Sequence, residues 1–132
     1  MSFSVKKHSK EEFYETFCKW LDSQNFPQIN KEILPENCFV AYVDEIPCYC
    51  IWVYFTDSKL AWIAFPASNK NVSYKKKQGG LDYLINYVCD YLKRKKILTV
   101  ITTSGTENVI KVLEKSGFEI GDSQINHYIK KL

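Results

Sequence analysis

The hydrophobic and polar positions of this 132-residue chain change spacing several times, and each change predicts a different element. Near the N-terminus, large apolar residues recur every three or four positions, which predicts an amphipathic helix. These residues are Phe13, Phe17, Trp20 and Leu21. Ser9 followed by two glutamates is typical of a helix start, and we expect the helix to end near residues 22–25. Residues 3–7 are expected to form a short first strand.

Three apolar runs follow at residues 38–43, 48–55 and 60–65, separated by short polar turns. Apolar runs joined by turns this short predict an antiparallel meander. The runs are apolar at successive positions, so we expect both faces of the sheet to be covered. Residues 26–37 contain two prolines and are expected to form an irregular connection.

The next segment has the pattern of a strand–helix–strand unit. A polar loop at residues 66–78 precedes a helical stripe that runs from residue 79 or 80 to about residue 95. A β-branched strand is expected at residues 97–103. The unit from residue 60 to residue 103 is therefore expected to be a right-handed parallel crossover.

The C-terminal part predicts one more helix and further strands. Val109, Ile110, Val112 and Leu113 supply an apolar helical face, and Gly117 is expected to end this helix in the left-handed conformation. A strand is expected to start at residue 118, and residues 122–132 are expected to form the last strand. The order β–α–βββ–α–β–α–β predicts one α/β domain over residues 1–132. Its sheet is expected to be mixed and mostly antiparallel, with helices on both faces.

The candidate binding chemistry lies where a lysine-rich loop meets a helix. Gly79 and Gly80 open the helix, so its first N–H groups and the positive end of its dipole are available to hold phosphate. Lys75, Lys76 and Lys77 add positive charge beside them. The alternative interpretation is a simple loop-to-helix hinge with a solvated run of lysines.

Charge and composition narrow the class of protein. The net charge is only +3, which does not favour nucleic-acid binding, and no apolar stretch is long enough to span a membrane. The N-terminus lacks the pattern of a signal peptide, so we expect a cytoplasmic protein. Five cysteines without a CxxC pair, and two histidines distant from them, indicate reduced thiols and no metal site.

Two local sequences stand out within this order of elements. Residues 76–81 read KKQGGL, and residues 106–118 read TENVIKVLEKSGF. Together with the order of elements, they resemble the GNAT superfamily of acetyl-CoA-dependent N-acetyltransferases over roughly residues 38–121. The family commonly has Arg/Gln-x-x-Gly-x-Gly/Ala at the first position, and ends its last helix with Tyr-Glu-Lys-x-Gly-Phe. The resemblance therefore implies a GNAT-like fold.

The resemblance also implies a cofactor site and a reaction. The pantetheine arm of acetyl-CoA would lie where the strand at 60–65 splays from the strand at 97–103. A backbone amide near Phe65 would polarise the thioester carbonyl, and an amine of a small molecule or a protein would attack it directly. Backbone groups that would hold the cofactor belong to Ile63, Ala64, Phe65, Gln78, Gly79, Gly80 and Leu81. Lys75, Lys76 and Lys77 would contact its phosphates.

The chain departs from the family pattern at positions that bear on catalysis. Leu81 stands where the second small residue belongs, and Leu113 stands where the family often has a tyrosine that protonates the leaving thiolate. These departures leave open a catalytically inactive GNAT-like binding or protein-interaction domain. Ile125 and Ile129 in the last expected strand are a candidate homodimer edge.

Candidates for the remaining catalytic and acceptor roles all have a structural alternative. Glu45 is a candidate general base or a turn residue, and Ser104 is a candidate catalytic residue or a helix cap. Trp52, Tyr54 and Trp62 are candidates to line an acceptor pocket, or are core residues of their strands.

Overall fold

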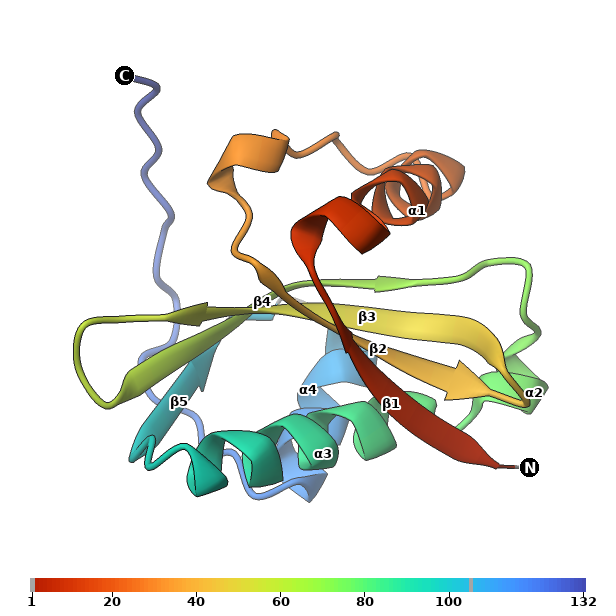
Figure 1. The fold of residues 1–132 in the computed structure, drawn as a ribbon. Helices are drawn as coiled ribbons and strands as arrows, with labels where there is room; N and C mark the ends of the chain where they lie inside the picture. Colours follow the sequence, from red (N-terminus) through yellow and green to blue (C-terminus); the bar gives the residue numbers. More distant parts are fainter. Residues whose placement is uncertain (1, 105) are drawn as a thin grey trace.

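A twisted mixed sheet forms the centre of the computed structural model, which describes residues 2–104 and 106–132 (Figure 1). In these residues the sheet has five strands in the order β1-β2-β3-β4-β5. The strands are β1 (Phe3–His8), β2 (Asn37–Val43), β3 (Ile46–Phe55), β4 (Leu60–Ser68) and β5 (Thr99–Thr102). Neighbouring strands pair antiparallel except β4 and β5, which pair parallel. The predicted meander, parallel crossover and mostly antiparallel sheet are therefore confirmed.

Helices cover both faces of this sheet, as predicted (Figure 1). The helical segments are α1 (Lys10–Ser23), the 3-10 turn η1 (Lys31–Ile33), α2 (Tyr74–Lys77), α3 (Gly80–Arg94) and α4 (Glu107–Lys115). Helix α1 packs on one face, where the rings of Phe17 and Trp52 meet edge to face with centroids 5.2 Å apart. Helix α3 packs on the other face through Leu84, Ile85 and Val88.

The start of α1 follows the sequence pattern closely. Ser9 accepts a hydrogen bond from the Glu12 N–H, and the Glu12 carboxylate accepts one from the Ser9 N–H at 2.8 Å. This reciprocal capping box satisfies backbone donors that a helix start leaves open. The four apolar residues predicted for its buried face are all buried.

The turn between β2 and β3 consists of Asp44 and Glu45, which both have positive φ, +48° and +68°. A two-residue turn with positive φ at both positions has the twist that antiparallel strands need. Glu45 is exposed in this turn. Its position follows from the turn that the sequence predicted.

Strand β4 is longer and the following loop is more ordered than the sequence indicated. The prediction of a polar loop over residues 66–78 was wrong near both ends of that range. Strand β4 continues to Ser68, and residues 74–77 form α2. Between Ala64 and Ala67, β4 has one residue more than the facing segment of β3 between Cys50 and Trp52, which is a β-bulge. Pro66 within the apolar run is the signal for such an irregularity.

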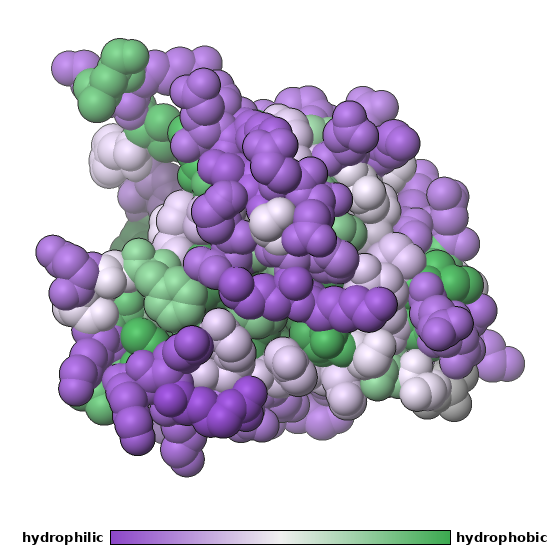
Figure 2. All heavy atoms as spheres, in the orientation of Figure 1, coloured by the Kyte–Doolittle hydropathy of each residue, from purple (hydrophilic) through white to green (hydrophobic). Residues whose placement is uncertain are grey.

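The prediction of strands after α4 was also wrong. Gly117 has a φ of +92°, as expected for the residue that ends a helix, but no strand forms in residues 118–132. This tail leaves α4 and passes the sheet as an extended segment (Figure 1). Ile125 and Ile129 in the tail are exposed. Figure 2 shows hydrophobic side chains along the left side of the molecule, where this tail stands away from the body. Alternating apolar residues become a strand only when a partner strand accepts their backbone groups.

No helix within residues 2–104 and 106–132 has the length and apolar character that crossing a membrane requires.

Candidate functional site

The parallel pair of strands opens into a fork. Strands β4 and β5 pair from Leu60 and Thr99 to Ile63 and Thr102. At this last pair the Thr102 hydroxyl donates a hydrogen bond of 2.8 Å to the Ile63 carbonyl. Strand β5 then ends, whereas β4 continues to Ser68. Among residues 2–104 and 106–132, the edge of β4 that faces β5 therefore has no strand partner beyond Ile63.

The β-bulge lies at the opening of the fork. Phe65 has a φ of +51°, a left-handed conformation that is unfavourable for a bulky residue and more so before a proline. Residues held in such conformations cluster at functional sites. Phe65 and Pro66 are the two residues of the bulge, and Pro66 has no N–H, so the backbone donor of the bulge is the Phe65 N–H. Along a strand, alternate residues direct their backbone groups to the same neighbouring strand. The Phe65 N–H therefore points to the same side of β4 as the Ile63 carbonyl, the side of β5.

Helix α3 begins close to the end of β4. Tyr49 pairs with Ser68 in the sheet, and a Cβ on Gly80 would lie 3.1 Å from the rings of both Tyr49 and Phe3. Gly80 is therefore small because the sheet lies against the helix start. Gly79 is different: its φ is +85°, and the nearest atom to an added Cβ is 3.8 Å away, so its backbone conformation is what requires glycine.

The start of α3 leaves backbone donors available. Gly79 is the N-cap residue and, in the described part of the chain, provides no side-chain hydrogen bond to the first turn. The N–H groups of this turn are thus candidates to bind an anion, and the dipole of the 15-residue helix favours one there. The predicted phosphate-binding segment, Gln78 to Leu81, forms this helix start.

The three lysines predicted to contact phosphate do not share one environment. Lys75 and Lys76 lie on α2 with exposed and part-exposed side chains. Lys77 is 8% exposed, donates a hydrogen bond of 2.9 Å to the Asn69 carbonyl, and lies 5.3 Å from the centre of the Tyr49 ring. Burial lowers the pKa of Lys77. The Lys77 ammonium therefore has its partners within the protein. Lys75 and Lys76 are the lysines of this segment whose charges are accessible.

Asn69 holds the segment between β4 and α2 and was not singled out from the sequence. Its N–H donates to the Cys48 carbonyl, its side-chain amide donates to the Pro47 carbonyl, and both bonds are 2.9 Å long. Its carbonyl accepts the Lys77 ammonium. These contacts fix the path of the chain toward Gly79. An asparagine in a polar loop gives no sequence signal that separates this role from ordinary turn chemistry.

An acidic side chain also lies at the start of α3. The Asp82 carboxylate is in the first turn, and its oxygen is 3.3 Å from the Lys115 ammonium of α4. This ion pair joins the two helices and offsets a negative charge that would otherwise repel an anion at this position.

The two weaker catalytic candidates lie apart from each other. Glu45 is in the exposed turn between β2 and β3, two strands from the fork. Ser104 follows β5 at the mouth of the fork, and its hydroxyl accepts a hydrogen bond of 3.2 Å from the Thr106 N–H. Glu45 lies in the turn that was its structural alternative. Ser104 is not the cap of α4, because the N-cap residue is Thr106, and the Ser104 hydroxyl instead forms a local turn. The structure does not bring them together.

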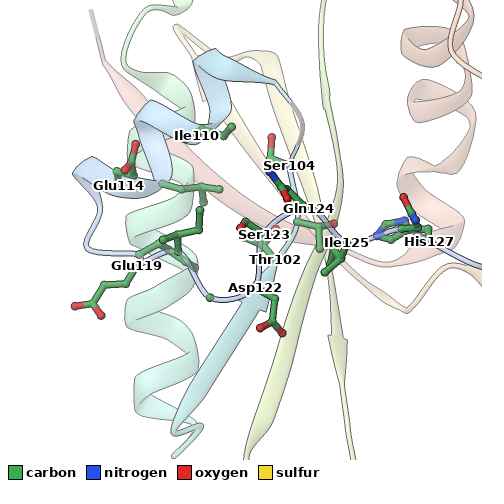
Figure 3. Close-up of a pocket in the computed structure, with 16 residues that line it drawn as sticks. Thr102, Ser104, Ile110, Glu114, Glu119, Asp122, Ser123, Gln124, Ile125 and His127 are labelled. Carbon is green, nitrogen blue, oxygen red and sulfur yellow. The ribbon is translucent and has the colours of Figure 1, made fainter.

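An open pocket of about 680 Å³ adjoins the end of β5. Thr102 and Ser104 face it from β5 and the following segment, and the C-terminal tail forms its opposite wall (Figure 3). Leu113 lines this pocket from α4. Its apolar side chain therefore faces this pocket at the end of β5. Within residues 2–104 and 106–132, no group of three or more potential metal ligands occurs.

Comparison with solved structures identifies the fold. An aminoglycoside acetyltransferase from an uncultured soil metagenomic sample, in complex with sisomicin, has a TM-score of 0.73 at 15% identity, covering 98% of this chain and 96% of that chain. Glucosamine-6-phosphate N-acetyltransferase from Arabidopsis thaliana has a TM-score of 0.65 at 14% identity, covering 98% and 100%. An acetyltransferase from Trypanosoma brucei has a TM-score of 0.64 at 13% identity, covering 97% and 100%. No protein-family model and no curated protein matches the sequence.

These similarities show that the chain has the GNAT-like fold of acetyltransferases. At sequence identities of 13–15%, these similarities establish the fold and do not identify a substrate. The fold expected from the sequence resemblance is confirmed.

Proposed function

We propose that this protein is an acetyl-CoA-dependent N-acetyltransferase. The observation that carries the proposal is the fork between β4 and β5, which opens beyond Ile63 and Thr102 in a chain with the GNAT-like fold. An elongated ligand that adds its own amides along the unpaired edge of β4 would complete the hydrogen bonds of that edge. The pantetheine arm of acetyl-CoA carries amides suited to this.

The thioester would lie beside the bulge. The Phe65 N–H, ahead of a proline that has no N–H, is the donor that would hold the thioester oxygen. A fixed donor directed at a developing oxyanion stabilises the transition state because it needs no reorganisation during the reaction. The left-handed conformation of Phe65 is then part of the site, and its strain is held by the surrounding sheet.

The phosphates of the cofactor would lie at the start of α3. The N–H groups of the first turn after Gly79 supply donors, and Lys75 and Lys76 supply mobile positive charge. Lys77 and Asn69 act indirectly in this proposal, because their hydrogen bond holds the loop that precedes Gly79.

The reaction is transfer of an acetyl group to a primary amine. The neutral amine nitrogen attacks the thioester carbon and the C–S bond breaks. The sulfur leaves as the thiolate of coenzyme A, and the proton lost from nitrogen passes to water. Solved neighbours named for this chemistry act on aminoglycosides and on glucosamine 6-phosphate, which supports an amine-bearing small molecule as the acceptor. We propose a cytoplasmic location for this activity.

One observation favours a second candidate function. Leu113 lines the pocket at the end of β5 and cannot protonate a leaving thiolate. A GNAT-like domain that binds the cofactor without turnover, or that serves as a protein-interaction domain, has no need for such an acid. The proposed enzyme would instead release the thiolate to water.

Titration calorimetry tests the proposal. Acetyl-CoA should bind, and desulfo-CoA should bind comparably because it keeps the pantetheine arm, whereas ATP should bind more weakly. The double variant Lys75→Ala/Lys76→Ala should lose several-fold to tenfold in affinity, since exposed charge pairs contribute about 0.2–1 kcal/mol each. Lys93→Ala, at the opposite end of α3, is the matched control and should bind normally.

Turnover is then measured as release of the coenzyme A thiol across a panel of amines. Binding with turnover supports the enzyme, and binding without turnover on any amine supports the inactive domain. If acetyl-CoA did not bind, the proposal would be overturned and only the assignment of the fold would stand.

A further inference from the structure

A row of apolar side chains crosses β3, β4 and β5 on the face of the sheet that also carries α1. Tyr54 pairs with Trp62, and Trp62 pairs with Ile101. The rings of Tyr54 and Trp62 stack with centroids 5.2 Å apart and planes 25° apart. Tyr54 and Trp62 are part-exposed, and Ile101 is 48% exposed. Helix α1 covers Trp52, two residues before Tyr54, and leaves this row open.

The row, named here the aromatic platform (Tyr54, Trp62 and Ile101), is held rigidly. The Tyr54 hydroxyl donates a hydrogen bond of 2.6 Å to the Ile33 carbonyl of η1. Phe65 packs edge-on against Tyr54, with centroids 6.4 Å apart, so the residue at the bulge also contacts the platform. Because stacked rings held from two sides have little freedom to lose, the platform is preorganised to receive a ligand.

Polar groups of the platform are not offered to a ligand. The proton of the Tyr54 hydroxyl is used by Ile33. The indole nitrogen of Trp62 is buried, with no hydrogen-bond partner in the part of the chain that the structure describes. Thr102 lies on the opposite face of the sheet, because it pairs with Ile63 of the α3 side. On the platform face of β5, Thr99 is exposed two residues before Ile101, so one hydroxyl borders the platform. A ligand centred on Tyr54 and Trp62 would meet ring carbons. A sugar, which needs several hydrogen bonds to its hydroxyls, fits that surface less well than a flat apolar ring.

The platform lies at a defined distance from the proposed site of reaction. Trp62 is two residues before Ala64, and three before Phe65 at the bulge. At about 3.3 Å per residue, a group over Trp62 lies about 7 Å along the strand from Ala64. An amine that reaches the thioester from a ring on the platform must therefore be separated from that ring by a short linker.

We propose that the aromatic platform is the acceptor subsite, and that the acceptor is a primary amine joined by a linker of two or three carbons to a flat apolar ring. This inference rests on the proposed function for the place of the thioester. The platform itself stands on the stacked pair, its exposure and its lack of free polar groups. Aromatic pairs contribute about 0.5–1.5 kcal/mol beyond the area that they bury, which corresponds to roughly threefold to tenfold in affinity.

The test compares amines of equal charge and different shape. Binding of 2-phenylethylamine, n-butylamine and glucosamine is measured by calorimetry, with and without saturating desulfo-CoA. We expect 2-phenylethylamine to bind about tenfold more tightly than the other two. Trp62→Leu should remove most of that preference, and Trp62→Phe should keep it. Ile101→Ser, at a half-exposed position where the fold is expected to tolerate it, should weaken the preference severalfold.

The matched control is Tyr87→Ala, which removes an exposed aromatic ring on α3, across the sheet from the platform. It should leave amine preference unchanged, and Trp62→Leu should leave desulfo-CoA affinity unchanged. If desulfo-CoA binds but the three amines bind equally, the platform proposal is overturned and the proposed function stands. If the ring-bearing amine binds preferentially but desulfo-CoA does not bind, the proposed function fails while the platform remains an amine site. Equal affinity of wild type and Trp62→Leu for 2-phenylethylamine would also overturn the platform.

Discussion

The Thr102 hydroxyl donates a hydrogen bond of 2.8 Å to the carbonyl of Ile63, at the last pair that joins β5 to β4. The bond closes the parallel ladder at the point where the two strands separate. The Ile63 carbonyl at the base of the fork thus accepts a hydrogen bond from a side chain. The next backbone groups of β4 on that side are those of Phe65. The fork has a fixed starting point because of this contact.

Removal of this hydroxyl should weaken the base of the fork. We expect Thr102→Val to lower the free energy of unfolding by about 1 kcal/mol, because the part-buried Ile63 carbonyl loses a donor while the side-chain volume is kept. Thr102→Ser keeps the hydroxyl and should stay closer to wild type. Urea unfolding of the three proteins measures the difference. Equal midpoints for wild type and the valine variant would argue against a structural role for the bond.

The two glycines before α3 should respond differently to alanine. Gly80→Ala places a methyl group 3.1 Å from the rings of Phe3 and Tyr49, and should cost about 1–3 kcal/mol by overpacking. Gly79→Ala has room but holds a φ of +85°, and should cost about 1–2 kcal/mol in backbone strain.

The substitution Phe3→Leu separates these two causes. It should relieve part of the cost of Gly80→Ala and none of the cost of Gly79→Ala, as measured by thermal unfolding of the single and double variants. Rescue of both glycine variants to the same extent would contradict the distinction between close packing and backbone strain.

Removing either partner of the ion pair at the start of α3 should change anion affinity, and the two removals should act in opposite directions. Asp82→Asn removes a negative charge from the first turn and should raise the affinity for desulfo-CoA a few-fold, most clearly at low salt. Lys115→Ala removes the partner of Asp82 and should lower that affinity. Lys111→Ala breaks the pair with Glu107 on the same helix and serves as the control. Calorimetry at two salt concentrations measures the affinity of each variant for desulfo-CoA. If Asp82→Asn and Lys115→Ala changed this affinity in the same direction, the proposed effect of the ion pair would be contradicted.

Alkaline pH should destabilise the fold through a buried thiol. Burial raises the pKa of Cys48 from 9 to about 11, against smaller opposing effects of Lys77 and of a backbone hydrogen bond. Between these two values the unfolded chain loses the proton and the folded chain keeps it, so stability falls as the pH rises from 9 to 11. The expected loss is on the order of 1–2 kcal/mol.

Denaturant unfolding from pH 8 to 11 measures this loss, and Cys48→Ala should show a shallower decline from a lower starting stability. Tyr49 should contribute a further decline in both proteins at higher pH, because burial raises its pKa to about 12. An unchanged slope in the alanine variant would assign the alkaline transition to other groups.

Local sequence patterns determined the three longer helices, α1, α3 and α4, but not the short helix α2. Helix α1 begins where Ser9 and Glu12 form the capping box, and α3 begins at the glycine pair, because helical hydrogen bonds and caps join residues close in the chain. The antiparallel meander of β2, β3 and β4 also followed from short turns between apolar runs. The phosphate-binding hypothesis depended on this same local signal and stays a prediction.

Tertiary structure alone decided the direction of Lys77, the bulge at Phe65 and the fate of residues 118–132. The three adjacent lysines look equivalent in the sequence, but only Lys77 meets the Asn69 carbonyl, whose position depends on β3. The bulge exists because β4 has one residue more than the facing part of β3, and the C-terminal residues lack a partner strand. Strand pairing joins residues far apart in the chain, so its register and its failures are set by the assembled sheet and not by the segment itself.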